Sequence, residues 1–319
     1  MKVAVLTSGG DSQGMNTCIN VLAKIASFNK KNELYGVLHG FQGLIDDEFI
    51  SLDYSAVKNA THIGGTMLKS SRSRKFTTVA GLESAISNIK KRKIDVVIAI
   101  GGDGSFRGLT ALNDAGINTV AIPATVDNDL FYTDNALGFD SAVNVAVNAI
   151  ESISQTMASL DRACVIEVMG RFCGSIALYA AATCACEVVA TNEHPLSEEE
   201  IIERVKKAIS KGIASPLVIV SEHLYDITKL AAEIEVNTKK ETKYNVLGYI
   251  QRGGSPSAKD RLLAMQFAVR AMELIENKKF NRAVGIKDNQ IIDVDMQTAN
   301  TRQTSFDEPL LRLFEKLNA

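Results

Sequence analysis

The sequence has little net charge and no long apolar run. Its 35 lysines and arginines almost balance its 37 aspartates and glutamates, so the formal net charge is only −2. A broad basic surface for nucleic acid or for an anionic membrane is therefore excluded. No stretch approaches the about 18 consecutive apolar residues of a transmembrane helix, and the first residues turn polar too early for a secretory signal. We expect a cytoplasmic protein.

Cysteine is scarce, and two common nucleotide-binding fingerprints are missing. There are five cysteines, and Cys184 and Cys186 lack the second pair or the histidines that would complete a zinc site. We predict buried free thiols, which suit a reducing cytoplasm. No Gly-Lys-Ser/Thr follows a glycine-rich loop, and no Gly-x-Gly-x-x-Gly opens the first helix. The first absence excludes a Walker A loop, and the second argues against a nicotinamide-dependent dehydrogenase.

What the sequence does contain is a regular alternation of short apolar runs and helical patterns. This alternation predicts an α/β fold with mostly parallel sheets, whose strands are covered on both faces. The length of 319 residues fits two medium domains, with a boundary near Gly138. The runs are residues 3–6, 34–38, 96–100, 119–122, 163–168, 187–190, 217–220 and 245–250. The helical patterns include residues 16–27, 81–91, 139–157, 197–210 and 259–276.

Glycine-rich turns follow two of the predicted strands. TSGGDSQGMN comes after residues 3–6, and GGDGS comes after residues 96–100. Ligands of parallel sheets bind beyond the carboxyl ends of the strands, where glycines and helix N-termini favour phosphate. A single turn of this kind is more often a simple tight turn than a phosphate site, but two at one sheet edge favour phosphate binding. The glycines concerned are Gly9, Gly10, Gly14, Gly101, Gly102, Gly104 and Gly108.

Acidic residues accompany these turns. Asp103 lies between glycines of the second turn, where a carboxylate can bind Mg²⁺ together with nucleotide phosphates. Asp127 and Asp129 belong to the segment PATVDND, and in an extended segment their side chains share one side. One carboxylate near the metal and one near an acceptor hydroxyl suit phosphoryl transfer. Alternatively, residues 127–129 only form a turn and cap a helix.

Four arginines occur in or beside glycine- and serine-rich turns. They are Arg72, Arg162, Arg171 and Arg252. The planar guanidinium matches the geometry of a phosphate group, which makes these arginines candidate phosphate ligands. For any one of them, an ordinary surface arginine is the alternative.

Taken together, these motifs resemble those of the bacterial ATP-dependent 6-phosphofructokinases. The matching segments occur in order over nearly the whole chain: LTSGGDSQGMN, GGT-x-L-x-S-x-R, IGGDGS, PATVDND, EVMGR, SEH and LGYIQRGGSP. The resemblance implies two Rossmann-like three-layer lobes with mostly parallel sheets. Residues 1–137 with about 251–300 would form the nucleotide lobe, and residues 138–250 with about 301–319 the sugar-phosphate lobe. It also implies a homotetramer whose subunits share active sites.

The implied reaction transfers the γ-phosphoryl group of ATP to the 1-hydroxyl of fructose 6-phosphate. Asp127 would be the base, while Asp103 and Asp129 would bind Mg²⁺. The backbone of Gly10, together with Arg72 and Arg171, would stabilise the transferring phosphoryl group. The nucleotide would contact Gly10, Phe41, Ser71, Arg72, Gly102, Asp103, Gly104, Ser105, Phe106 and Gly108. The sugar phosphate would contact Thr125, Asp127, Asp129, Arg162, Met169, Gly170, Arg171, Glu222, Lys243, Tyr249 and Arg252.

Two small residues favour ATP over pyrophosphate as the donor. Pyrophosphate-using members of the family typically have an aspartate at the position of Gly104 and a lysine at that of Ala124, and here both positions are small and neutral. Other positions depart from the family. Tyr249 replaces a histidine, and Lys243 replaces an arginine, which should weaken binding of the sugar phosphate.

The cationic positions of the family's regulatory site are mostly lost. They correspond here to Asn20, Lys24, Tyr54, Ser154, Lys211 and Ile213. We therefore expect little or no response to ADP or phosphoenolpyruvate. Two alternatives to a 6-phosphofructokinase stay open: a kinase for another sugar phosphate, such as tagatose 6-phosphate, and a non-catalytic regulatory paralogue.

Overall fold

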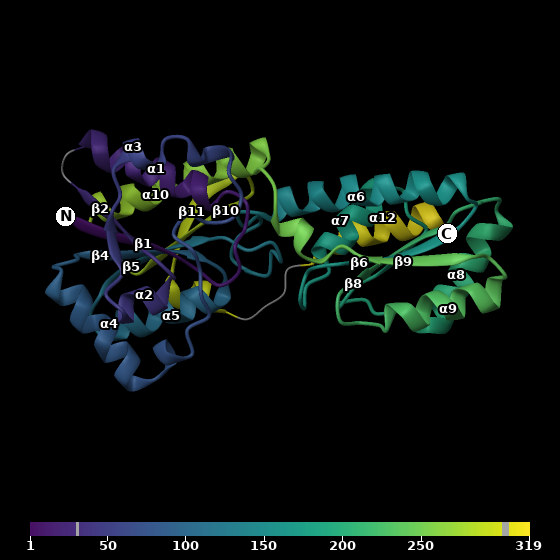
Figure 1. Ribbon diagram of the computed structural model, residues 1–319, viewed down its shortest axis with the longest axis horizontal. Helices are drawn as coiled ribbons and strands as arrows, with labels where there is room; N and C mark the ends of the chain where they lie inside the picture. The colour runs from purple at the N-terminus through teal and green to yellow at the C-terminus, as the bar shows by residue number, and fades with distance from the viewer. Residues whose placement is uncertain (30–31, 302–305) are drawn as a thin grey trace. The chain divides into compact units, whose positions relative to one another are not determined.

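A computed structural model describes residues 1–29, 32–301 and 306–319, and the chain divides into two compact units. The first unit comprises Met1–Ser141 and Arg252–Thr304, and the second comprises Ala142–Gln251 and Ser305–Ala319. Each unit contains a mostly or wholly parallel sheet with helices on both faces, so the α/β prediction is confirmed (Figure 1). Which ligand each unit binds stays a prediction.

The first unit is built on a seven-stranded sheet in the order β11-β10-β5-β4-β1-β2-β3. Its five central strands are parallel, and the two edge strands, β3 and β11, are antiparallel to their neighbours. The strands are β1 (Lys2–Ser8), β2 (Glu33–Val37), β3 (Phe49–Ser51), β4 (Val96–Gly101), β5 (Asn118–Pro123), β10 (Arg282–Lys287) and β11 (Gln290–Asp295).

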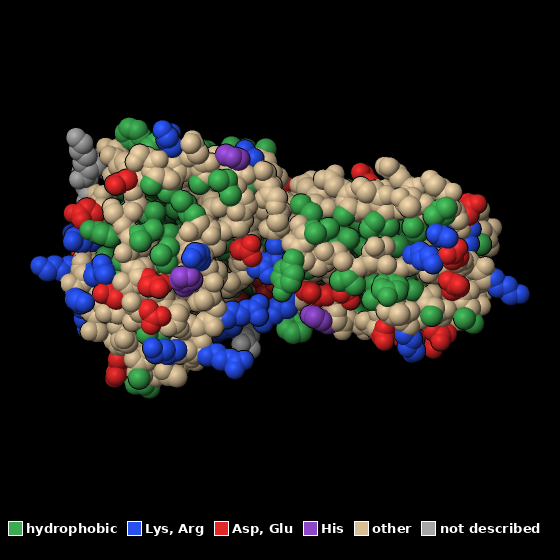
Figure 2. Space-filling model, viewed as in Figure 1, with side chains coloured by type: hydrophobic (Ala, Val, Ile, Leu, Met, Phe, Trp, Pro, Cys, Tyr) green, Lys and Arg blue, Asp and Glu red, His purple; other side chains and the backbone are tan. Residues whose placement is uncertain are grey.

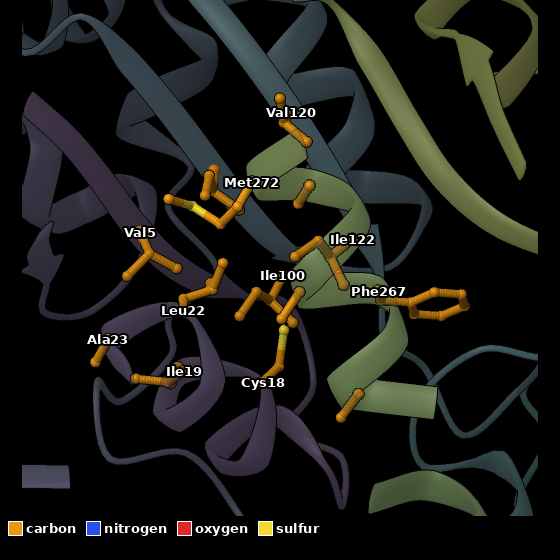
Figure 3. Close-up of a cluster of buried hydrophobic side chains, with 14 of the residues drawn as sticks. Val5, Cys18, Ile19, Leu22, Ala23, Ile100, Val120, Ile122, Phe267 and Met272 are labelled. Carbon is orange, nitrogen blue, oxygen red and sulfur yellow. The ribbon is translucent and has the colours of Figure 1, made fainter. Parts of the chain in front are cut away.

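Two apolar cores cover the two faces of this sheet. Side chains alternate between them along each central strand: Val3 and Val5 of β1 face one core, whereas Ala4 and Leu6 face the other. The first core includes residues of α1 (Met15–Asn29) and α10 (Ala258–Glu276), and Figure 3 shows these side chains packed against the strands. The second core includes residues of α2 (Phe41–Ile45), α4 (Val79–Lys91), α5 (Asp103–Asp114) and α11 (Met296–Ala299).

The second unit has a four-stranded parallel sheet in the order β7-β8-β6-β9. Its strands are β6 (Ala163–Val168), β7 (Val188–Ala190), β8 (Leu217–Ser221) and β9 (Thr242–Val246). One face packs against α8 (Glu198–Ser210) and α9 (Ile227–Thr238). In Figure 1 the opposite face is covered by α6 (Phe139–Ser159), α7 (Ser175–Thr183) and α12 (Glu308–Asn318).

The five predicted helical patterns correspond to α1, α4, α6, α8 and α10, and each end agrees within two residues. The strand predicted over residues 245–250 is wrong beyond Val246. The strand β9 ends at Val246, and Gly248–Arg252 forms a 3₁₀ helix instead. Gly248 has φ +52°, a left-handed conformation that ends an extended strand and that glycine adopts readily.

The surface and the thiols agree with the composition. Figure 2 shows acidic and basic side chains interspersed over the visible face of each unit. All five cysteines are free; four are buried and Cys184 is half-buried. Burial raises the pKa of the Cys164 thiol to about 11, which makes it a poor nucleophile at neutral pH. No helix among the described residues is both long and apolar enough to span a membrane.

Candidate active site

The two glycine-rich turns of the first unit leave the same edge of the sheet. Ser8 at the end of β1 is in register with Gly101 of β4, which in turn is in register with Pro123 of β5. The order of the strands reverses here, because β2 lies on one side of β1 and β4 on the other. Such a switch point is where open α/β sheets bind their ligands.

Close packing between the two turns requires a glycine at position 101. The Ser105 hydroxyl donates to the carbonyl of Ser8 at 3.2 Å, which ties the second turn to the first. A Cβ at Gly101 would lie 2.2 Å from the Ser105 Oγ and 2.5 Å from the Ser8 carbonyl oxygen. No side chain fits there without moving one of the turns.

The second turn opens α5, and Asp103 is the first residue of this helix. The helix N-terminus carries a partial positive charge and free N–H groups, both suited to a phosphate. The Asp103 side chain is 31% exposed and accepts a hydrogen bond from Arg107, one helical turn later. The carboxylate is therefore at the surface but already has a cationic partner.

The expected aromatic residues of the nucleotide site lie in the core instead. Phe41 is only 6% exposed and packs against Phe76, with 4.5 Å between ring centroids. A Cβ at Gly108 would lie 2.5 Å from the Phe41 ring, so this glycine makes room for the aromatic ring. The place of Phe106 in the nucleotide site stays a prediction. Phe106 is completely buried, because it lies on the inward face of α5.

The loop that carries Arg72 is held by the serines on either side of it, since the Ser70 hydroxyl donates to the carbonyl of Gly9 and the Ser73 hydroxyl to the side-chain oxygen of Gln42. The Ser71 hydroxyl donates to the carbonyl of His39 at 2.7 Å. Arg72 is exposed and forms no hydrogen bond or ion pair with any residue that the structure describes. Its guanidinium is therefore available to an anionic ligand.

The acidic segment presents alternate side chains to solvent. Thr125, Asp127 and Asp129 are half-exposed, whereas the residues between them are buried. The segment therefore has the shared side that the spacing predicts. The Thr125 hydroxyl accepts from the N–H of Asp127 at 3.2 Å, and a Cβ at Gly102 would lie 3.4 Å from the Thr125 Cβ. Asp127 and Asp129 thus follow β5, the strand that pairs with β4, after which the Asp103 turn begins.

Asn128 forms the turn that the alternative interpretation assigned to the whole segment. It has φ +52°, donates to the carbonyl of Asp134 at 3.0 Å and accepts from the N–H of Ala136 at 2.8 Å. Neither neighbouring aspartate caps a helix, since α6 begins only at Phe139. The Asn128 side chain and its left-handed backbone thus close this turn.

Arg252 returns to the first turn from the far end of the sequence. Its guanidinium pairs with the Asp11 carboxylate at 2.5 Å and donates to the Asp11 carbonyl at 3.2 Å. A Cβ at Gly10 would lie 2.7 Å from the same guanidinium. The completely buried Gln13 donates to the carbonyl of Gly253 at 2.7 Å and so fixes the segment that carries Arg252.

The second unit builds a separate turn after β6, over Met169, Gly170 and Arg171. One oxygen of Glu222 accepts from the N–H of Gly170 at 3.2 Å and from that of Arg171 at 2.7 Å. Gly170 has φ +153°, and a Cβ there would lie 2.2 Å from the carbonyl oxygen of Cys173. Glu222 therefore holds the backbone on which the exposed Arg171 side chain is carried.

Two expected phosphate-binding cations share one carboxylate. Glu241 pairs with Arg162 at 2.8 Å and with Lys243 at 2.9 Å. Hydrogen bonds from Lys243 and then Arg162 lower the pKa of the Glu241 carboxyl. Tyr249, expected at the same site, is 79% exposed on the 3₁₀ helix that follows β9.

A family model described as phosphofructokinase matches residues 2–275. The chain belongs to the phosphofructokinase family. Among its relatives, an ATP-dependent 6-phosphofructokinase of Alkaliphilus metalliredigens is 41% identical over 316 residues, covering 99% of each chain. One of Clostridioides difficile is 39% identical over 306 residues, covering 96% of each. The recognition of this family from the motifs is confirmed.

Solved phosphofructokinases share the fold. That of Pichia pastoris in the T-state matches 99% of this chain with a TM-score of 0.89 and 25% identity. The enzyme of Saccharomyces cerevisiae matches 99% of this chain with a TM-score of 0.84 and 26% identity. The chain spans only 36% and 47% of these two fungal chains, respectively.

Sequence reasoning missed several residues that hold the site of this family member together. Glu241 lies two residues before Lys243, so the strand period places both side chains on one side; this spacing was a usable signal. Asn128 and Gln13 gave no comparable signal, because their partners lie in loops whose paths the sequence does not reveal.

Proposed function

We propose that this protein is an ATP-dependent 6-phosphofructokinase, which phosphorylates the 1-hydroxyl of fructose 6-phosphate in glycolysis. The single observation that carries the proposal is the meeting of three strand ends in the first unit. There two glycine turns and the acidic segment leave adjacent strands in register. Relatives near 40% identity over the whole chain carry this activity in their names.

Asp127 is the proposed base that removes the proton from the acceptor hydroxyl. Asp127 is half-exposed and follows β5, the strand that pairs with β4, and the Asp103 turn comes directly after β4. Thr125 orients it through the hydrogen bond to its backbone N–H. The backbone N–H of Gly10 and the exposed guanidinium groups of Arg72 and Arg171 stabilise the negative charge on the phosphoryl group in transfer.

Asp103 and Asp129 are the proposed ligands of a magnesium ion that accompanies ATP. No cluster of three or more acidic, histidine or cysteine side chains able to hold a metal occurs in the described parts of the chain. One or two carboxylates are nevertheless what Mg²⁺ uses when nucleotide phosphates and water complete its coordination, so the donor set fits. When bound, the ion neutralises charge that develops on the phosphates.

The nucleotide is proposed to bind over the α5 N-terminus, with Gly102, Gly104 and Ser105 nearest its phosphates. Gly104 has open space on its side-chain face apart from the Arg107 guanidinium at 3.9 Å. Ala124 is 1% exposed and packs in the first core, so its methyl group does not crowd a ligand. Both positions support ATP rather than pyrophosphate as the donor.

Several of the residues proposed to bind the sugar phosphate contact acidic side chains in the free protein. Glu222, Met169 and Gly170 contact the sugar, and Arg171 lies on the turn that Glu222 fixes. The 6-phosphate is bound by Arg162, Lys243, Tyr249 and Arg252. Each of the three cations has an acidic partner in the free protein, which keeps the long side chain ordered until a phosphate replaces that partner.

We further propose self-association to a homotetramer in the cytoplasm. The strand β9 is an edge of its sheet, and Tyr244, Val246, Tyr249 and Ile250 on and after it are exposed. An open strand edge with apolar side chains favours pairing with another chain. Weak regulation by ADP and phosphoenolpyruvate is also proposed. It is supported by Asn20, which is buried and donates to the carbonyl of Val57 rather than facing a ligand.

A panel of donors and acceptors tests the proposed function. ATP and pyrophosphate are each paired with fructose 6-phosphate and with tagatose 6-phosphate, and product formation is measured. We expect turnover with ATP and the highest kcat/KM for fructose 6-phosphate. A higher value for tagatose 6-phosphate, which Lys243 and Tyr249 would favour, would reassign the acceptor. Absence of turnover with every pair would support a regulatory paralogue.

A further inference from the structure

Arg107 lies one helical turn after Asp103 on α5 and reaches back to it. The Arg107 Nη1 atom donates to the Asp103 carboxylate, and its Nη2 atom lies 3.9 Å from where a Cβ of Gly104 would be. Helical side chains point toward the N-terminus, so an arginine here extends over the preceding turn. Because Gly104 has no side chain, the guanidinium lies over bare backbone at the opening of the proposed nucleotide site.

This contact conflicts with the proposed role of Asp103. A carboxylate that binds a divalent cation is here already paired with a monovalent one, and the two cations repel each other at such short range. Neither partner is locked by burial, since the side chains of Asp103 and Arg107 are 31% and 49% exposed. The guanidinium can therefore leave the carboxylate without exposing a buried charge.

We propose that Arg107 is the counter-ion of Asp103 in the free enzyme and that it transfers to the nucleotide phosphates when magnesium-bound ATP arrives. The inference rests on the proposed function and assigns a nucleotide-binding role to a residue that the motifs did not single out. A guanidinium matches a phosphate as well as it matches a carboxylate, so the transfer exchanges one charge-assisted hydrogen bond for another.

The consequence is a difference between two binding equilibria. When magnesium-free ATP binds the wild-type enzyme, Arg107 neutralises the charge of Asp103. In a variant without Arg107, the same negatively charged polyphosphate binds next to an unneutralised Asp103 carboxylate and is repelled by it. When magnesium-bound ATP binds the variant, the contact between Arg107 and the phosphates is lost. This loss is offset because the variant has no Arg107–Asp103 ion pair that the magnesium ion must first break. Removal of Arg107 therefore weakens binding of magnesium-free ATP much more than binding of magnesium-bound ATP.

The test measures ATP binding by calorimetry, without any acceptor, in EDTA and in excess Mg²⁺. For Arg107→Gln we expect the Kd in EDTA to rise about tenfold, as for loss of one charge-assisted contact. In Mg²⁺ the Kd should change less than about threefold. By linkage, the Mg²⁺ concentration that half-saturates the enzyme–ATP complex should fall by the ratio of these two factors. Lys58→Gln removes an equally exposed charge from the same unit and should leave both Kd values unchanged.

Each outcome decides one claim. Equal changes in both Kd values, or none in either, would overturn the exchange and leave Arg107 as an ordinary phosphate ligand or a helix-stabilising residue. If wild-type protein binds no ATP under either condition, the proposed function itself fails. Arg107→Lys keeps the charge without the planar fork, and its ratio of Kd values should lie between those of wild type and Arg107→Gln. This second variant decides the question if the glutamine variant fails to fold.

Discussion

In the first unit, buried polar groups hold the turns of the candidate site, whereas in the second unit partly exposed carboxylates hold the expected binding residues. Ser105, Gln13 and Asn128, which hold the first unit's turns, are 1%, 0% and 8% exposed. Glu222 and Glu241, which serve the second unit, have side chains that are 19% and 44% exposed. Buried hydrogen bonds keep one geometry, while exposed ion pairs exchange partners at little cost. We interpret the first unit as preorganised for chemistry and the second as adjustable for binding.

The largest effect should come from the proposed base in the first unit. Asp127→Ser removes the proton acceptor, so kcat should fall about 10²- to 10⁴-fold, the usual contribution of general base catalysis. The Kd values for ATP and fructose 6-phosphate should change little. Steady-state kinetics together with binding titrations measure both quantities. A variant with near-normal turnover would show that Asp127 is not the base.

The next effect concerns the packing between the two glycine turns. Gly101→Ala places a methyl group 2.2 Å from Ser105 Oγ, and the free energy of unfolding should fall by about 3 kcal/mol. Gly104→Ala on the same turn meets no atom closer than 3.9 Å and should be neutral or slightly stabilising. Denaturant unfolding measures both variants. Equal stability of the two would contradict the close packing.

A binding effect of intermediate size is expected at Glu222 in the second unit. Glu222→Ala leaves the N–H groups of Gly170 and Arg171 without their acceptor, so the KM for the acceptor should rise about 10- to 100-fold. Glu222→Gln keeps an acceptor oxygen and should lose much less. Initial-rate measurements at saturating ATP separate KM from kcat. A large loss of kcat with normal KM would instead give Glu222 a role in chemistry.

The smallest effect is expected at Glu241, which pairs with Arg162 and Lys243, the two cations proposed to bind the sugar phosphate. Glu241→Gln removes this competing charge, so the KM for fructose 6-phosphate should fall by about 1.5- to 5-fold, the range for exposed ion pairs. Glu203→Gln on α8, an exposed carboxylate that pairs with Lys206, provides a matched control. If KM rises instead, Glu241 orders the cations more than it competes for them.

The sequence predicts local periodicity and the ends of strands well, because both depend on neighbouring residues. The runs around Val3, Val96 and Thr119 became adjacent strands, and the turns after them meet as the rule for parallel sheets requires. The hairpin of β10 and β11 was missed, although Asp288 and Asn289 between its strands both have positive φ, as a type I′ turn requires. The sequence signal for this turn was the Asp-Asn pair itself, because both residue types tolerate positive φ.

The contacts that connect distant segments lay outside what local patterns reveal. Gln13 and Gly253 are separated by 240 positions, and nothing in either neighbourhood indicates their hydrogen bond. The burial of Phe106 was missed for a different reason. The motif IGGDGS predicts a turn, but it does not indicate which face of the following helix α5 packs inward. The helical period places Phe106 on that buried face. Predicted roles of individual site residues stay predictions until the variants are measured.

The pairing of β5 with β10 has a consequence for biosynthesis. Val120 of β5 is in register with Arg282, so 162 residues separate the two partners. At roughly 5–20 residues per second, a nascent chain waits about ten to thirty seconds between making one strand and the other. Throughout that interval the ribosome-bound chain carries an open, apolar strand edge, which makes β5 the segment where chaperone binding or misassembly during translation should concentrate.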